Sequence, residues 1–558
     1  MQRESLNIMI GGEAGQGLVT IGQVLAKALV RSGYWIVVSQ SYMSRVRGGH
    51  NTFTIRASAQ PLLGPREGVD LLVALNQETL DLHQHELAPG SRVLADTGLS
   101  CAAAPCLNVP YAELAEERYL NTVAVGVAGG LLGLKPALLQ ELLSAQLHKL
   151  SDEVVEDNQQ ALQAALDWLN KQAHDFTPLP PAAEQGRRLM LNGNEAMALG
   201  ALAGGLKFLA FYPMTPSTSI ALNVIAQAHK LGVVTEQAED ELAAVNMALG
   251  ASYAGAPAMV CTSGGGYALM TEGLSLAGMS ETPLVIALAM RPGPATGLPT
   301  RSEQGDLNFA LHGGHGEFPR AVLTPGTVEE CFAAGAQALR LAEEFQTPVF
   351  ILTDQFLADS YRAVQPFDLA AIEPVRAGSV EPGPDYQRYA VTDSGVSPRA
   401  LPGFGPGLVV ADSDEHDQDG HITEDLELRV VMQDKRLRKH QGLQAVAWPP
   451  VFSGPEEPEL LLVSWGSSQG PVAEAAQRLN AQGRRVATCH FGQVWPLEPA
   501  QFRERFQKAG QVVVIEGNAD GQFAGLLRLE TGLAAQRLIT RYDGLNFTPE
   551  YILRRLAE

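Results

Sequence analysis

The chain has few cysteines, and they are scattered. Its 558 residues include only five cysteines, at positions 101, 106, 261, 331 and 489. No two form a Cys-x-x-Cys pair, and no third cysteine lies near Cys101 and Cys106. The sequence therefore offers no framework for an iron–sulfur cluster or zinc, and we expect no metal on this chain. We interpret the cysteines as small buried hydrophobic residues in a reducing compartment.

Long apolar runs and a secretory signal are missing too. The most apolar long stretch, residues 119–134, is interrupted by Asn121 and four glycines. It falls short of the ~20 apolar residues that a membrane span needs. The first residues, Met-Gln-Arg-Glu-Ser, lead straight into a core-like strand without the apolar region of a signal peptide. We expect a cytoplasmic protein.

Basic residues are outnumbered. The 40 Lys and Arg against 61 Asp and Glu give a net charge of −21, which argues against a nucleic-acid surface. With 46% hydrophobic and 18% charged residues, the composition is that of a globular protein with sizeable cores. The length allows about three or four domains.

Strand-like and helix-like segments alternate over most of the chain, which predicts an α/β protein with parallel sheets covered on both faces. We divide the chain into a first α/β body (1–175), a proline-rich linker (176–186) and a second body (187–365). An irregular excursion rich in Pro, Gly and Asp (366–455) precedes a third body (456–558), whose first strand starts at Leu460.

The segment Tyr212-Pro-Met-Thr-Pro-Ser-Thr218 follows the apolar run 208–211. Two prolines restrict the backbone around Thr215, so its hydroxyl has little freedom to lose on binding. A rigid hydroxyl at the end of a strand is suited to hold a small anionic substrate. An ordinary strand-to-helix loop with a Pro-Ser-Thr cap is an equal alternative.

The segment 236–250 predicts a helix with acidic residues in its first turn. At helical spacing, Glu241 shares a face with Ala244, Val245 and Ala248. A carboxylate on this small, apolar face is costly to bury unless it has a task or a partner. Alternatively, Glu241 merely belongs to the acidic turn, as Glu239 does.

Two further turns follow strand-like runs. Thr262-Ser263-Gly264-Gly-Gly266 predicts a glycine turn at a helix N-terminus, where the backbone can approach a ligand, although tight packing explains it equally well. Arg291 ends the apolar run 284–290 and opens a loop stiffened by proline and glycine, which leads to Thr300 and Asp306. This arginine suits a bidentate carboxylate contact, and a surface ion pair is the alternative.

Two other segments have weaker signals. The turn with Gly12, Gly15 and Gly17 can cradle a phosphate, or it is a tight turn without a ligand. The basic residues Arg45, Arg47 and His50 support a phosphate site only weakly. The acidic run 412–421 does not fit an EF-hand, because Leu426 occupies the position of the bidentate glutamate. We favour a solvated loop, with a structural cation or a lid over a cofactor pocket as alternatives.

The motifs YPMTPST, EDELAAVNMALGASYAGA, TSGGGYALM and RPGPATGLPTRSEQGD, in this order, resemble the alpha subunit of thiamine-diphosphate-dependent 2-oxoacid:ferredoxin oxidoreductases. Residues 11–17 and 45–51 resemble the gamma domain of that family, so the chain looks like a gamma–alpha fusion. The resemblance covers nearly the whole chain. Among such fusions, the pattern is most similar to 2-oxoglutarate:ferredoxin oxidoreductase.

This resemblance implies three α/β domains: a gamma-like domain, a pyrimidine-type thiamine diphosphate domain and a domain similar to the C-terminal domain of transketolase. It implies coenzyme-A-dependent, reversible oxidative decarboxylation of a 2-oxoacid, with 2-oxoglutarate giving succinyl-CoA as the best match. The catalytic residues would be Glu241, Thr215 and Arg291, and Thr215, Arg291 and Thr300 would bind substrate. Glu241, Thr262, Ser263 and Gly264 would contact thiamine diphosphate, and Gly12, Gly15 and Gly17 a phosphate of coenzyme A.

The resemblance also implies that this chain holds only half of an active site. In the family, a Gly-Asp-Gly motif binds the metal that holds the cofactor diphosphate, and no such motif occurs here; Gly305-Asp306-Leu307 and Ala519-Asp-Gly521 each miss one element. We therefore expect Mg and [4Fe-4S] on a beta subunit, in an alpha–beta or (alpha–beta)₂ assembly. Since ferredoxins are usually acidic, we expect ferredoxin to dock on that partner.

Three alternatives stay open at this point. The substrate is pyruvate or a branched-chain 2-oxoacid; or the chain is a non-catalytic scaffold or regulatory subunit with a decayed pocket; or it serves a thiamine enzyme without clusters, of the transketolase or pyruvate-dehydrogenase kind.

Overall fold

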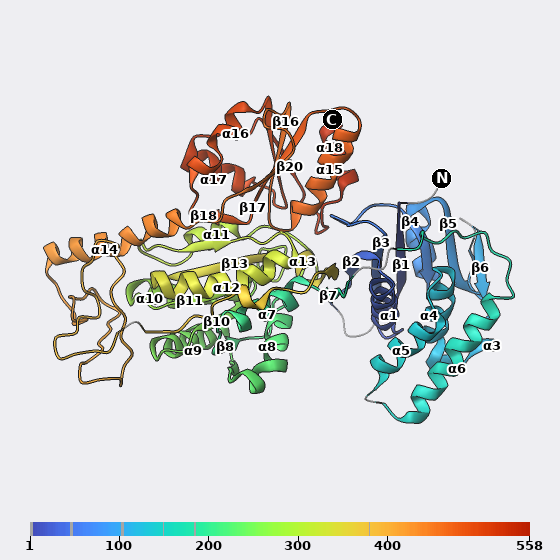
Figure 1. Ribbon diagram of the computed structural model, residues 1–558, viewed down its shortest axis with the longest axis horizontal. Helices are drawn as coiled ribbons and strands as arrows, with labels where there is room; N and C mark the ends of the chain where they lie inside the picture. The colour runs from blue at the N-terminus through green and yellow to red at the C-terminus, as the bar shows by residue number, and fades with distance from the viewer. Residues whose placement is uncertain (1–3, 45–47, 102–104, 149, 183–185, 379) are drawn as a thin grey trace. The chain divides into compact units, whose positions relative to one another are not determined.

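The computed structural model describes residues 4–44, 48–101, 105–148, 150–182, 186–378 and 380–558. Strands and helices alternate along most of the chain, which confirms the expected α/β class (Figure 1). By packing, the chain divides into two compact units: the first is Met1–Leu191, Asp359–Pro366 and Thr548–Glu550, and the second is Asn192–Ala358, Phe367–Phe547 and Tyr551–Glu558. In the described ranges, no helix combines the length and the apolar character that crossing a membrane requires.

The first unit is built on an eight-stranded sheet in the order β6-β5-β4-β1-β3-β2-β14-β7. Four neighbouring strands run parallel: β1 (Ser5–Glu13), β4 (Val69–Ala74), β5 (Leu87–Asp96) and β6 (Cys106–Val109). By contrast, β3 (His50–Ser58) is antiparallel to both β1 and β2 (Trp35–Ser41). The sheet is therefore mixed, which corrects the purely parallel sheet expected here. Residues 42–49, which join β2 to β3, are too few for the crossover that a parallel pair needs.

Both faces of this sheet are covered. On one face, four helices pack together: α1 (Leu18–Arg31), α4 (Leu120–Leu131), α5 (Pro136–Leu147) and α6 (Asp152–Leu169). Alternate side chains of β1, such as Ile8, point into the large core below them, while Met9 belongs to a smaller cluster with Leu80 of α2 (Gln77–His83) on the other face. A short helix, α3 (Tyr111–Leu114), follows β6.

Two short strands from distant parts of the sequence complete the edge of the first sheet. β7 (Leu189–Leu191) and β14 (Arg362–Val364) form an antiparallel pair, and β14 also pairs with β2. Residues 187–191 and 359–365 were expected in the second body, but they pack with the first unit. The linker residues described between 177 and 182 have no regular secondary structure.

The second unit contains a seven-stranded sheet in the order β18-β12-β13-β11-β10-β8-β9. Six of its strands run parallel: β8 (Phe208–Phe211), β9 (Val234–Gln237), β10 (Ala258–Thr262), β11 (Leu284–Met290), β12 (Ala321–Leu323) and β13 (Pro348–Asp354). At one edge, β18 (Gln493–Trp495) pairs antiparallel with β12. Two short helices, α11 (Leu307–His312) and α13 (Gln355–Asp359), follow β11 and β13 along the chain.

The helices around this sheet form two groups. α7 (Gly193–Ala203) packs against α8 (Thr218–Leu231) and α12 (Val328–Phe345), and α9 (Glu241–Tyr253) packs against α10 (Gly264–Met279). The connection that leaves β8 leads outward to β9, whereas the connection that leaves β10 leads to β11 on the other side. In open α/β sheets, ligands bind at the carboxyl ends of the strands where the direction of winding changes, which here is between β8 and β10.

A second sheet of this unit follows the order β15-β17-β16-β19-β20. Four strands run parallel: β16 (Leu460–Trp465), β17 (Val486–Phe491), β19 (Gln511–Glu516) and β20 (Arg537–Thr540); β15 (Val451–Ser453) is antiparallel to β17. The helices of this segment are α15 (Gln469–Ala481), α16 (Arg503–Lys508), α17 (Gln522–Thr531) and α18 (Pro549–Ala557). We propose that the two sheets are the cores of the bodies assigned to 187–365 and 456–558.

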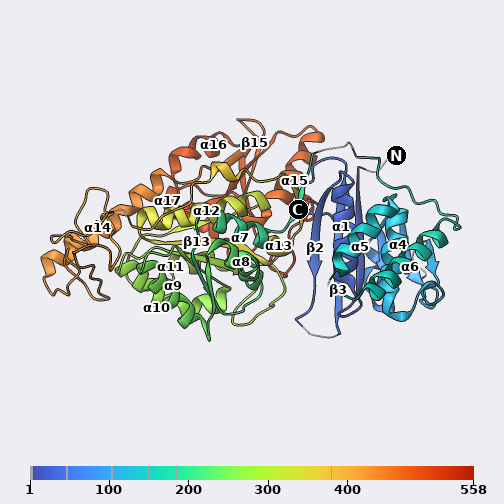
Figure 2. The ribbon, with the colours of Figure 1, turned by 60° about the horizontal axis from the view of Figure 1, so that its bottom comes forward.

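The segment 366–455 was expected to be irregular, but it contains the 20-residue helix α14 (Leu426–Ala445), beside which the loops of the segment lie (Figure 2). The helical pattern is hidden because three of its buried residues are Lys435, Arg436 and Lys439. Because these buried positions hold charged residues, the segment shows no apolar repeat at helical spacing.

The acidic run 412–421 is a loop held largely by its own hydrogen bonds. Asp417 Oδ1 accepts three backbone N–H groups at 3.0 Å, from residues 419, 420 and 421. Glu415 forms ion pairs with Arg429 and Arg436 of α14. His416 is fully buried against Tyr389, so the loop is less solvated than its charge indicates.

Candidate active site

The loop after β8 is held in place by its neighbours. Asn194 Nδ2 donates to the carbonyl oxygen of Pro216 at 2.8 Å, and Arg291 Nη1 donates to the carbonyl oxygen of Thr215 at 2.7 Å. Thr215 itself is half-buried. The structure therefore brings together Thr215 and Arg291, which are 76 residues apart in the sequence.

Arg291 stands where the sequence placed it, directly after the last residue of β11. It is half-buried, and no ion pair is found between its guanidinium group and any described carboxylate. Burial lowers the pKa of Arg291, and the negative charge of Asp306 partly offsets this. A cation held near the carboxyl ends of three parallel strands, with one nitrogen on a carbonyl oxygen, still has N–H groups to offer an anion.

Glu241 is the first residue of α9, and its side chain is buried, with an exposed fraction of 3%. The helix starts later than expected: residues 234–237 form β9, Asp240 caps α9, and Glu241 is the acidic residue of the first turn. The helix face that Glu241 was predicted to share is buried: residues 244, 245 and 248 are fully buried, whereas Glu239 is exposed. Glu241 Oε1 has no hydrogen-bond partner, so this buried carboxylate has an oxygen to offer a ligand.

The glycine turn after β10 lies directly against this carboxylate. A Cβ atom at Gly266 would stand 2.5 Å from Glu241 Oε1 and 2.2 Å from Thr262 Oγ1, so only glycine fits there. Thr262 and Ser263 are fully buried, and the Ser263 hydroxyl has no partner. The expected contact residues Thr262, Ser263 and Gly264 therefore lie at the start of α10, beside Glu241.

A second carboxylate, which the sequence did not single out, approaches the same turn. A Cβ atom at Gly264 would lie 2.6 Å from Asp306 Oδ2, an oxygen that is buried and without a partner. Burial raises the pKa of Asp306 to about 6, and Arg291 opposes this shift. Burial and the charge of Asp306 also raise the pKa of Glu303. The sequence marked Asp306 only as part of the incomplete motif Gly305-Asp306-Leu307 and gave it no role at the site, because an aspartate before a short helix is common.

The loop that carries these residues is fastened to the C-terminal segment of the same unit. Gln304 Nε2 donates to the carbonyl oxygen of Trp465 at 3.0 Å, and its Oε1 accepts the Gly517 N–H at 2.7 Å. Asn518 and Gln522 donate to the carbonyl oxygens of residues 304 and 305. Thr300 is buried in the same loop. The second sheet of the unit thus fixes the position of Thr300 and Asp306.

The glycine turn of the first unit borders a cavity of about 530 Å³. Gly15 and Gly17 line it, together with Asp96, Arg118 and Asn121, whereas Gly12 lies within β1. Gly17 begins α1 without a side-chain cap, so N–H groups of the helix remain available there. Arg45 and Arg47 lie outside the described residues, and His50 forms a 2.7 Å contact with His83.

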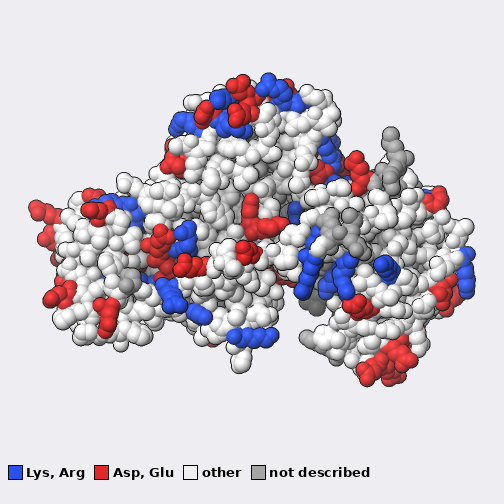
Figure 3. Space-filling model, viewed as in Figure 1, with Lys and Arg blue, Asp and Glu red and all other residues white. Residues whose placement is uncertain are grey.

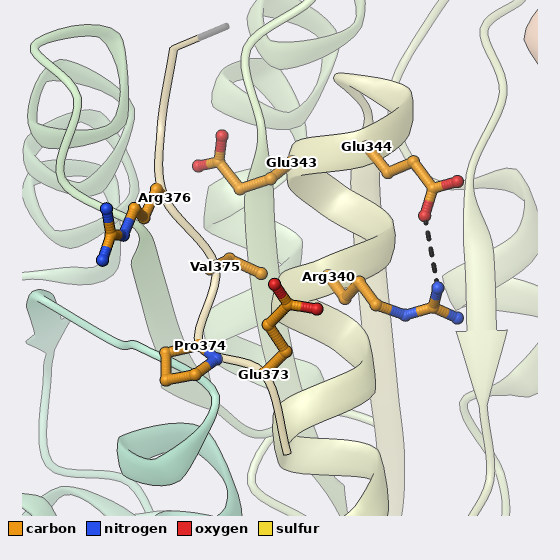
Figure 4. A pocket seen from close by; sticks show the side chains of 7 residues that line it. All are labelled: Arg340, Glu343, Glu344, Glu373, Pro374, Val375 and Arg376. Carbon is orange, nitrogen blue, oxygen red and sulfur yellow. Dashed lines mark hydrogen bonds and ion pairs between the residues drawn. The ribbon is translucent and has the colours of Figure 1, made fainter. Parts of the chain in front are cut away.

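Another cavity, of about 710 Å³, lies between the end of α12 and residues 373–376 (Figure 4). Three of its charged side chains are in ion pairs: Arg340 pairs with Glu344, and Glu343 with Arg399. None of the residues expected at the active site lines it, and we assign it no catalytic part.

Comparison with known proteins bears on both units. Residues 199–435 match the family described as pyruvate flavodoxin/ferredoxin oxidoreductase, thiamine diphosphate-binding. Residues 7–168 match the family described as pyruvate ferredoxin/flavodoxin oxidoreductase.

Relatives match over almost their whole length. The alpha subunit of 2-oxoacid:ferredoxin oxidoreductase 2 from Aeropyrum pernix is 30% identical, over 97% of this chain and 95% of that protein. The chain belongs to the 2-oxoacid:ferredoxin oxidoreductase alpha-subunit family. Another member, the 2-oxoglutarate oxidoreductase subunit KorA of Mycobacterium tuberculosis, is 30% identical over 99% of this chain and 91% of its own.

A solved structure shows the same fold throughout. The 2-oxoglutarate:ferredoxin oxidoreductase of Magnetococcus marinus, determined with 2-oxoglutarate, coenzyme A and succinyl-CoA bound, superposes with a TM-score of 0.94. It is 32% identical and covers 100% of this chain and 99% of its own. The family resemblance read from the motifs is thereby confirmed.

Proposed function

We propose that this chain is the alpha subunit of a thiamine-diphosphate-dependent 2-oxoacid:ferredoxin oxidoreductase that acts with a beta subunit. The reaction joins a 2-oxoacid and coenzyme A to give an acyl-CoA and carbon dioxide, and two electrons pass to ferredoxin. 2-Oxoglutarate is the substrate we propose, with succinyl-CoA as product. The support is the neighbouring structure, which was determined with both compounds bound and whose chain aligns from end to end.

The observation that carries the proposal is the buried Glu241 carboxylate with its unpaired Oε1 beside the glycine turn. Such an oxygen fits a donor on a flat heteroaromatic ring, as the aminopyrimidine of thiamine diphosphate offers. When bound, that cofactor supplies a nucleophilic carbon and an electron sink for decarboxylation. Glu241 Oε1 would accept a hydrogen bond from the protonated ring nitrogen. This hydrogen bond would favour the tautomer of the ring that can accept a proton from the reacting carbon.

Arg291, Thr215 and Thr300 would bind the substrate. The guanidinium group of Arg291 is fixed by the Thr215 carbonyl oxygen and can direct its remaining N–H groups to the 1-carboxylate of the 2-oxoacid. The Thr215 hydroxyl stands in the same loop and would orient the keto oxygen. Thr262, Ser263 and Gly264 would contact the cofactor, since Thr262 ends β10, Ser263 caps α10 and Gly264 begins it.

A partner would supply the metal for the diphosphate and the iron–sulfur cluster, because the chain lacks the motifs for both. Exposed apolar side chains on α9 and α10 support this: Leu242, Met247 and Leu269 are 40–47% exposed on the two helices that begin at the site. We expect ferredoxin to meet the beta subunit. On the face shown in Figure 3, acidic and basic side chains are intermixed over the C-terminal segment and form no basic patch for an acidic protein.

Coenzyme A would bind in the cavity of the first unit. Its volume of about 530 Å³ is within the usual range for small-molecule sites. The uncapped start of α1 at Gly17 favours a phosphate, with Gly15 in the lining and Gly12 in the strand that precedes the turn.

The test uses the chain co-expressed with the beta subunit and measures coenzyme-A-dependent viologen reduction across a panel of 2-oxoacids. Glu241→Gln should fold normally and slow turnover by on the order of 100-fold or more, the range expected for lost acid–base catalysis. Glu239→Gln, two residues away and exposed, is the matched control and should be nearly silent.

Four outcomes would count against the proposal. Equal effects of the two variants would show that the wrong carboxylate was chosen. Full turnover of the Glu241→Gln complex would favour a scaffold subunit, and robust turnover by the isolated chain would remove the need for a partner. Preference for pyruvate or a branched-chain 2-oxoacid would replace the proposed substrate.

A further inference from the structure

The first turn of α10 has a carboxylate on each of two sides. Glu241 packs on Gly266, and Asp306 packs on Gly264. Each carboxylate has one buried oxygen without a partner. The proposed function gives a task to Glu241 and leaves Asp306 without one.

Asp306 and Arg291 interact electrostatically but are not in direct contact. Each shifts the pKa of the other, yet the two form neither a hydrogen bond nor an ion pair. Asp306 Oδ2 is buried without a partner at the first turn of α10, in the loop that Arg291 opens, so a substrate carboxylate bound to Arg291 would come close to Asp306. Two ionised carboxylates this close in a partly buried site repel each other, whereas a neutral Asp306 can donate its O–H to the substrate.

We propose that Asp306 takes up a proton when the 2-oxoacid carboxylate binds at Arg291, so that substrate affinity depends on pH through this residue. The inference rests on the proposed function and deepens it. Asp306 is prepared for this role because burial has already raised its pKa to about 6, against 3.8 for an ordinary aspartate. The neighbouring carboxyl group of the loop is Glu303, whose pKa is raised by burial and by the charge of Asp306.

The direction of the pH dependence of substrate binding follows from the pKa of Asp306. Below pH 6, Asp306 is already protonated in the free enzyme, and substrate binds without proton uptake. Above pH 6, binding must draw a proton from solvent, so the apparent KM rises by up to about tenfold per pH unit until the pKa of the bound state is reached. Because kcat/KM reports on the free enzyme, it should fall with pH over the same interval.

The kinetic test measures the apparent KM for 2-oxoglutarate with the alpha–beta complex between pH 5.5 and 8.5. In this window the substrate carboxylates stay ionised. Asp306→Asn should remove the slope and give a lower KM than the native complex at pH 8. Glu303→Gln is the matched control and should keep the slope. A native KM that does not change with pH overturns the inference, and this holds even if Asp306→Asn fails to fold.

A binding measurement separates this inference from the proposed function. 2-Oxoglutarate is titrated calorimetrically at pH 7.5 into the Glu241→Gln complex, which turns over slowly, in buffers of different ionisation heat. Uptake approaching about one proton per site is expected, and none after Asp306→Asn is added. Binding without proton uptake overturns the role of Asp306 alone. Failure to bind overturns the substrate assignment and the inference with it.

Discussion

Exchanging Glu281 for glutamine is expected to destabilise the second unit strongly without touching the proposed active site. Glu281 lies between α10 and β11 with an exposed fraction of 1%. Its carboxylate forms ion pairs with Lys435, at 2.7 Å, and with Lys439, both on α14. Arg388 donates to the backbone oxygen of Glu281. Glutamine keeps the size and the backbone conformation and removes only the charge.

The magnitude follows from the charges left behind. Burial alone would raise the pKa of Glu281, but Lys439, Lys435 and Arg388 outweigh burial and hold it at about 2. Without this carboxylate, three buried cations face one another with no counter-charge. Removing one partner of a buried ion pair costs about 3–5 kcal/mol, because the other charges stay desolvated. That is a large share of the stability of a typical domain.

The dependence on pH is specific. Burial lowers the pKa of Lys439 to about 7, below the 10.5 of an unfolded chain, and removal of Glu281 should lower it further. The unfolded chain of the variant then binds more protons than the folded one above pH 7, so its stability rises with pH. The native protein gains stability in the same way once its own Lys439 loses its proton near pH 7, so the deficit should shrink as pH rises towards 7 and level off above it. In the native protein, the contribution of Glu281 is present above pH 4.5 and is lost as pH falls towards 2.

Urea unfolding at pH 5.5 and pH 7.5 measures the loss and its dependence on pH, and hydrogen exchange of the α14 amides locates it. Glu272→Gln, an exposed position on α10, is the control and should stay within about 0.5 kcal/mol. Adding Lys439→Met to the variant should recover part of the loss. A deficit below about 1 kcal/mol, or one that does not change with pH, would refute the view that this cluster is a charge-balanced anchor for α14.

Two further expectations concern the substrate loop. Arg291→Lys should raise the apparent substrate KM by roughly tenfold, because lysine keeps the charge and loses the second hydrogen bond. Steady-state kinetics and melting curves test this expectation. Lower stability with an unchanged KM would show that the role of Arg291 is purely structural. Gln304→Ala leaves the Gly517 N–H without its partner, while the Trp465 carbonyl oxygen keeps the hydrogen bond from Ser468 Oγ. This should cost about 1–3 kcal/mol and lower kcat/KM through displacement of the loop; a loss of stability with full kcat/KM would separate the loop from catalysis.

The parts of the site that could be predicted from the sequence share a simple periodicity. Glu241 was found because its helix places small residues under it at positions 244, 245 and 248, and these are buried. Arg291 was found because it ends an unbroken apolar run, which is a strand buried along its whole length. In both cases, local spacing fixes which way the residue faces.

The parts that were missed depend on contacts between distant segments. Asp306 acquires its environment from Gly264 and Arg291, which local spacing does not connect to it. α14 was hidden because its buried side chains include Lys435 and Lys439, whose partner Glu281 lies more than 150 residues away. A buried charge that is neutralised from a distance leaves no apolar signal in its own segment.

The glycines at the start of α10 explain why the site takes this form. Side chains at positions 264 and 266 would displace the two carboxylates from the helix N-terminus, where the backbone N–H groups favour negative charge. Gly265 between them is exposed, so the front of the turn is open to a ligand. In the proposed function, one carboxylate would face the cofactor ring, and the other would lie near the cation that receives the substrate anion. We infer that this turn sets the distance between the cofactor and substrate ends of the site, and that a partner subunit closes its open front.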